Sequence, residues 1–158
     1  MTDKLDAAKL ADRVAALVEA AKRAGADTAD AVAVRGRSAG VSVRLGKVEG
    51  TESSESEDVA LRVFVGQRVA SVSATAASDP KALAERAVAM AKVSPEDPYQ
   101  GLADPALLAR SPRDLDLFDA TEVPADALKE AALAAEAAAL AVKGVTNSAG
   151  SSAGSARP

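Results

Sequence analysis

The sequence predicts an α+β fold, in which an antiparallel sheet of four or five strands over residues 31–75 is flanked by helices. Apolar residues recur at helical spacing before residue 25, alternate with other residues between 31 and 75, and return to helical spacing after Asp79 and Pro124. Alternation, rather than continuous apolar runs, is typical of antiparallel strands that bury one face. The helices predicted over residues 3–24 and 80–93 are therefore expected on one face of the sheet.

Residues 3–24 show the periodicity of an amphipathic helix. Asp3 is suited to cap its start and Gly25 to end it. The apolar positions that share the spacing are Ala7, Leu10, Val14, Leu17, Val18 and Ala21.

The strand region contains several short alternating segments. Val32 and Val34 alternate with small or polar residues, and so do Val41, Val43 and Leu45. A turn is expected between them, at residues 36–40. Residues 59–65 alternate most clearly. Gly66-Gln67 fits a type II′ hairpin, with residues 69–75 as the returning strand. Glycines 36, 40, 46 and 50 are interpreted as turn and bulge residues, because none has the strand-to-helix placement of a phosphate-binding loop.

The second half of the chain is mostly helical or irregular. Asp79-Pro80 predicts a helix start. Five prolines and several aspartates predict a long irregular connection over residues 94–124, with one short turn at 105–109. An alanine-rich helix is expected over 125–142, ended by Gly144. Val145-Thr146 resembles a strand start, and residues 144–158 are interpreted as a strand cut short or a disordered tail.

Composition excludes several kinds of chemistry. The 158 residues include neither His nor Cys, which removes disulfides, thiolate zinc sites and every Ser-His or Cys-His dyad. A net charge of -4 gives no electrostatic footprint for nucleic acid. The first residues lack an uninterrupted apolar stretch, so neither a signal peptide nor a membrane span is expected and the predicted location is the cytoplasm.

Clustered carboxylates on one segment are the strongest candidate for a metal site. Oxygen ligands of this kind can hold calcium or magnesium, but the spacing matches no EF-hand loop, and a strand would divide the residues between its two faces. The alternative interpretation is a solvated strand edge that charge protects from pairing. The residues are Glu49, Glu52, Glu55, Glu57 and Asp58.

Serines and aspartates give two further sets of candidates, and neither is predicted to be catalytic. A serine nucleophile would need a lysine partner that no nearby position supplies. Aspartates in the 94–124 connection, near Tyr99, are typical of residues that close turns and cap helices. The two sets are Ser53, Ser54, Ser56, Ser71 and Ser73, and Asp97, Asp104, Asp114, Asp116 and Asp119.

The sequence contains five segments, in one order, that together resemble a known family: residues 45–49 (LGKVE), 60–66 (ALRVFVG), 94–102 (SPEDPYQGL), 114–119 (DLDLFD) and 144–148 (GVTNS). The match is to the amino-terminal domain of the TldD/PmbA family, also called modulators of DNA gyrase, and the stretch around Tyr99 is more similar to the PmbA (TldE) branch. The chain departs from the family at Arg68-Val69-Ala70, where glycine is usual, and at Ala149, where an acidic residue is usual.

The resemblance implies a cytoplasmic, zinc-dependent peptidase made of one TldD and one PmbA subunit, which acts on unstructured peptides. The family's zinc is held by a His-Glu-x-x-x-His helix in the carboxy-terminal half of the TldD subunit. No residue of this sequence corresponds to a metal ligand or general base. The expected cofactor of this chain is therefore none, and its expected partners are a TldD-type subunit and the peptide substrate of the complex.

Two functional hypotheses remain open. In the first, residues 1–143 are the non-catalytic amino-terminal domain of a PmbA-type subunit, and the chain would continue into a second domain. In the second, the chain is a free-standing α+β module that binds an extended peptide at an exposed strand edge. A complete hydrolase is the weakest interpretation, because only carboxylates, lysine, tyrosine and hydroxyls remain for catalysis. The alanine-rich helix is apolar on more than one face, and the strand start at Val145-Thr146 has no obvious mate. The isolated chain is therefore expected to self-associate or to be only marginally stable.

Overall fold

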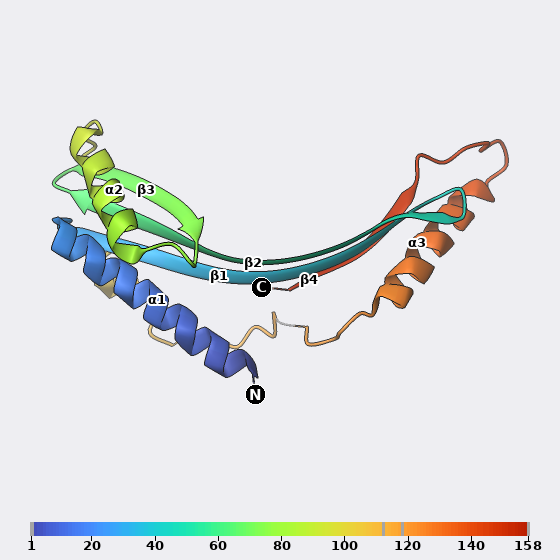
Figure 1. The fold of residues 1–158 in the computed structure, drawn as a ribbon, viewed down its shortest axis with the longest axis horizontal. Coiled ribbons are helices and arrows are strands. Elements are labelled where there is room, and N and C mark those ends of the chain that lie inside the picture. The colour runs from blue at the N-terminus through green and yellow to red at the C-terminus, as the bar shows by residue number, and fades with distance from the viewer. Residues whose placement is uncertain (1, 112, 118, 158) are drawn as a thin grey trace. The chain divides into compact units, whose positions relative to one another are not determined.

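A computed structural model describes residues 2–111, 113–117 and 119–157, with side chains from Ala7 onward. Predictions that involve Pro112, Phe118, Pro158 or the Asp3 side chain lie outside the described residues. The element order is α1 (Thr2–Ala24), β1 (Thr28–Arg44), β2 (Lys47–Val65), β3 (Arg68–Thr75), α2 (Pro80–Val93), the 3-10 turn η1 (Pro105–Leu107), α3 (Ala125–Leu140) and β4 (Ser151–Arg157). In this part of the chain the strands form one antiparallel sheet in the order β3-β2-β1-β4 (Figure 1). The predicted α+β class is confirmed.

The chain divides into two compact units that share the long strands β1 and β2. The first unit comprises Met1–Arg35 and Glu57–Pro112, and the second comprises Gly36–Ser56 and Arg113–Pro158. Each unit has its own hydrophobic cluster.

The first unit packs α1 and α2 on one sheet face, as predicted. Alternate residues of β2 point into its core, and small residues of the helices allow close packing against them. Arg13 of α1 donates to the Ser78 carbonyl at 3.1 Å, and Arg68 of β3 donates to the Lys92 carbonyl at 2.6 Å. The buried residues include Leu17, Ala21, Val59, Leu61, Val63, Val72, Ala84, Ala87, Val88 and Ala91.

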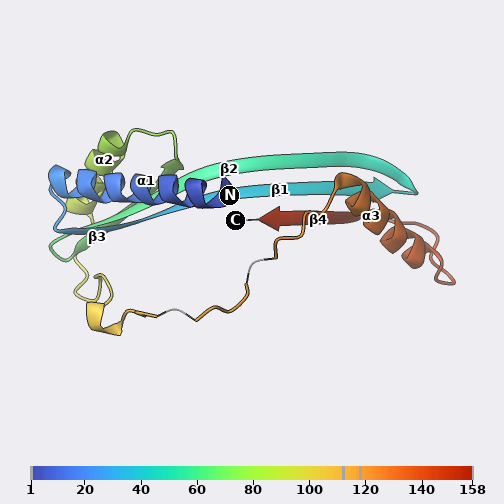
Figure 2. The ribbon, with the colours of Figure 1, turned by 90° about the horizontal axis from the view of Figure 1, so that it is seen from below.

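The second unit is smaller and packs α3 against β1 and β4. Val41 and Val43, two residues apart on β1, are buried with Leu128 and Ala132 of α3. β4 pairs antiparallel with β1 from Val43 opposite Ser151 to Arg37 opposite Arg157. Figure 2 shows the strands of this unit side by side in the order β2, β1, β4.

The number and length of the strands differ from the sequence prediction. Residues 31–75 hold most of the long strand β1, all of the long strand β2 and the shorter β3, not four or five short strands, and the fourth strand is Ser151–Arg157. Residues 36–40 do not turn but belong to β1, because β4 pairs with residues 37–43 and keeps this part of β1 extended. Of the four glycines interpreted as turn and bulge residues, Gly36, Gly40 and Gly50 lie within strands and Gly46 lies in a turn. Val145-Thr146 precede β4 and are not part of a strand.

Both two-residue hairpin turns have positive φ angles. At Gly66-Gln67 only the glycine is positive, at φ 59°, which is the pattern of the predicted type II′ turn. At Leu45-Gly46 both residues are positive, at φ 49° and 74°. A leucine in the left-handed region is strained, because its Cβ approaches the following carbonyl oxygen.

The remaining elements begin and end close to their predicted positions. The Asp79 carboxylate accepts from the amides of Lys81 and Ala82 at 3.2 and 3.3 Å, so the predicted cap of α2 is confirmed. α3 ends at Leu140, two residues earlier than predicted. Within the described residues, no helix is long and apolar enough to cross a membrane.

Substitution of Leu45 should report the backbone strain at the Leu45-Gly46 turn. Because asparagine tolerates the left-handed region better, Leu45→Asn is expected to raise the free energy of unfolding by about 0.5 kcal/mol. Leu45→Val should lower it by about 1 kcal/mol, because a β-branched side chain fits there worst. Urea denaturation measures both. Lys47→Asn, at a neighbouring position without positive φ, is the control, and an equal gain from it would argue against strain at Leu45.

Candidate functional site

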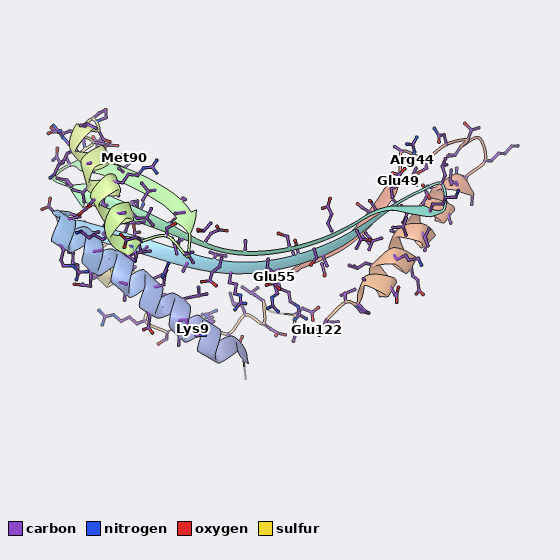
Figure 3. The ribbon with its side chains drawn as sticks, viewed as in Figure 1. Lys9, Arg44, Glu49, Glu55, Met90 and Glu122 are labelled. Carbon is purple, nitrogen blue, oxygen red and sulfur yellow. The ribbon has the colours of Figure 1, made fainter. Side chains whose placement is uncertain are left out.

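The acidic residues singled out in the sequence lie along β2 with exposed side chains. Glu55 pairs with Arg37 of β1 at 3.1 Å, and Glu49 lies 4.0 Å from Arg44 (Figure 3). Among the described residues, no group of three or more His, Cys, Asp or Glu is arranged to hold a metal ion. The exposure of these residues and their ion pairs to Arg37 and Arg44 are typical of the alternative interpretation, a solvated strand edge.

Pairing along β2 shows where that edge is. β3 pairs with β2 only from Asp58 to Val65. Residues 47–56, which belong to the second unit, lie beyond the end of β3. In the described chain their neighbouring strand is β1, on one side. We call the other side of residues 47–56 the free edge.

The candidate serines lie on two neighbouring strands. Ser53, Ser54 and Ser56 lie on exposed positions of β2, and Ser71 and Ser73 lie on exposed positions of β3. These positions are those of ordinary solvent-facing strand residues.

The aspartates of the long connection mainly close local turns. Asp97 accepts from the amide of Tyr99 at 3.0 Å, and Asp104 accepts from the amide of Ala106 at 2.8 Å. The same pattern recurs from Asp114 to Asp116 and from Asp119 to Thr121, and the bond from the Thr121 amide lowers the pKa of Asp119. Tyr99 itself is exposed. The four carboxylates thus accept hydrogen bonds from backbone amides two residues further along the chain, as the turn interpretation predicts.

Sequence reasoning missed the one buried acidic side chain among the described residues, Glu136 of α3, which is 3% exposed. Its two carboxylate oxygens accept from the amides of Leu45 and Gly46 at 2.9 and 2.8 Å. These are the two residues of the β1–β2 turn. These two hydrogen bonds hold the turn against α3, although the bonded residues are about 90 positions apart in the sequence.

Hydrogen bonds also lower the pKa of Glu136. The amide of Gly46 is the largest cause of its lowered pKa, followed by the Ser148 side chain, the Leu45 amide and the charge of Arg44. The Ser148 hydroxyl also accepts from the Gly150 amide at 2.9 Å, just before β4. Glu136 thus joins the β1–β2 turn, α3 and the segment that leads into β4.

Comparison with known proteins places this fold in a family. The profile described as PmbA/TldA metallopeptidase domain 1 matches residues 29–91. The metalloprotease PmbA homolog of Haemophilus influenzae is 37% identical over 84% of the chain, and the metalloprotease PmbA of Escherichia coli O157:H7 is 40% identical over 71%. The chain belongs to the TldD/PmbA family. The predicted PmbA branch and amino-terminal domain are confirmed, and the chain spans 30% and 26% of the lengths of these relatives.

Two solved structures share the fold at low sequence identity. A candidate modulator of DNA gyrase from Bacteroides thetaiotaomicron superposes with a TM-score of 0.81 at 20% identity, covering 92% of this chain and 34% of its own. TldE from Thermococcus kodakarensis superposes with a TM-score of 0.69 at 19% identity, covering 91% of this chain and 33% of its own. Both support the arrangement of strands and helices described above.

Proposed function

We propose that this PmbA-type domain is the non-catalytic amino-terminal part of a subunit that works with a TldD-type subunit in a zinc-dependent peptidase. The observation that carries the proposal is the identity of 37% and 40% to two PmbA metalloproteases over most of the chain. These 158 residues contain no His or Cys, so zinc and catalysis are proposed to lie outside this domain, in the TldD-type subunit. The proposed substrates of the complex are unstructured peptides, and its proposed location is the cytoplasm.

A domain exchange tests this role. The first domain of Escherichia coli O157:H7 PmbA is replaced by this chain, and the chimera is mixed with the TldD-type subunit of the same organism. We expect the two proteins to co-purify and to cleave an unstructured peptide, with one zinc retained in the TldD-type subunit. Cleavage should be absent when either protein is omitted.

The matched control is the same PmbA with its first domain deleted. If the deletion protein pairs and cleaves as well as the chimera, the domain has no part in the complex. If the isolated 158-residue chain binds one zinc and cleaves peptide, the assignment of catalysis to the partner is wrong. Metal analysis by mass spectrometry and a fluorescent peptide assay distinguish these outcomes.

A further inference from the structure

The free edge of β2 presents unpaired backbone groups over a long distance. In an extended strand, N–H and C=O groups point to both sides, and residues 47–56 have β1 on one side only within the described chain. At roughly 3.3 Å per residue the edge is about 30 Å long. Unpaired donors and acceptors in such a row form a template for another strand.

Several common means of protecting an edge are missing from this segment. Residues 47–56 contain no proline and one lysine, Lys47. The helix of this unit does not cover them, because the buried residues of α3 pack with β1 and the partly buried Ala153 of β4. The main remaining feature that can protect this edge from pairing is the negative charge of Glu49, Glu52 and Glu55.

These charges oppose pairing between two copies of the chain. An antiparallel pair centred on Glu52 places Glu52 opposite its own counterpart and Glu49 opposite Glu55. Like charges directly opposite one another destabilise a strand pair. The edge is therefore poorly suited to a second copy of itself.

The same charges favour a basic strand. Among the described residues Glu52 has no ion-pair partner, while Glu49 and Glu55 make exposed pairs that contribute little stability. Glu49 and Glu55 project from one face of β2 and Glu52 from the other. Lysine or arginine at several positions of an incoming strand would thus meet a carboxylate on either face.

We propose that residues 47–56 of β2 bind an extended, lysine- or arginine-rich polypeptide segment as an added strand. Backbone hydrogen bonds provide the affinity and the glutamates select the sign of charge. The inference is argued from the strand edge of the described residues and does not depend on the proposed peptidase role.

Synthetic peptides test the proposal on the full 158-residue chain. The probe is a ten-residue peptide of alternating lysine and threonine, titrated while amide hydrogen exchange is followed by NMR. We expect slower exchange at alternate amides of residues 47–56. A glutamate-threonine peptide and a lysine-threonine peptide with every backbone nitrogen methylated should not produce this protection.

Charge variants provide the second readout. Glu52→Lys should weaken binding of the lysine-threonine peptide by about fivefold to tenfold, because a favourable cross-strand pair becomes a repulsive one. Glu130→Lys makes the same change of net charge at an exposed position of α3 and should change affinity less than about twofold. Undiminished binding of the methylated peptide, protection at β3 or β4 instead of β2, or no binding at millimolar peptide would each overturn the proposal.

Discussion

Replacement of Leu61 by alanine should lower the free energy of unfolding by about 3 kcal/mol. Leu61 is 1% exposed and lies on β2 in the core of the first unit, among Leu17, Val63 and Val88. The loss combines the transfer of the leucine side chain from water with the cavity that remains. This core is built largely of alanine and valine, so few large neighbours are available to fill that cavity. Urea denaturation followed by circular dichroism measures the change.

Two further substitutions make the result specific to the first core. Leu107→Ala removes a leucine that is 82% exposed, and it should change the free energy of unfolding by less than about 0.5 kcal/mol. Leu128→Ala removes the largest buried side chain that α3 contributes to the second unit. It should remove exchange protection from α3 and β4 while α1 and α2 keep theirs. Equal losses in both units would show that they do not have independent cores.

Elements with strong local patterns were predictable from the sequence. α1 and α2 followed from the spacing of residues such as Leu17 and Ala87, and the cap at Asp79 followed from its position before Pro80. The Gly66-Gln67 hairpin followed from turn chemistry. Each of these features depends on residues within a few positions of one another.

Features that depend on distant pairing were not predictable. Residues 36–40 and 151–157 are rich in glycine, serine and alanine, which are poor strand formers alone. The two segments are nevertheless extended, as parts of β1 and β4, because they pair with each other. In the same way, Glu136 lies in an alanine-rich helix where a glutamate is ordinarily exposed. Its burial follows from the two turn amides at Leu45 and Gly46.

The second large effect is expected at Glu136, where Glu136→Gln should destabilise the β1–β2 turn. The carboxylate accepts from two backbone amides, but a glutamine side chain has one accepting oxygen and an NH2 group that donates. One of the two turn amides would then face another donor. We expect faster hydrogen exchange at Leu45 and Gly46 and a lower free energy of unfolding at pH 7. Glu130→Gln, an exposed position on the same helix, should change neither.

The difference in free energy of unfolding between the wild-type chain and Glu136→Gln should depend on pH. This dependence distinguishes an effect of the carboxylate charge from an effect of side-chain packing. Because hydrogen bonds, above all from the Gly46 amide, lower the pKa of Glu136 from its ordinary value of 4.5, its contribution is fully present above that value. The contribution is lost as pH falls through the lowered pKa in the folded state. The stability gap between the wild-type chain and Glu136→Gln should therefore be largest at neutral pH and should close in acid, as urea denaturation at a series of pH values would measure. A gap that stays constant with pH would mean that the shape of the side chain, rather than its charge, holds the turn to α3.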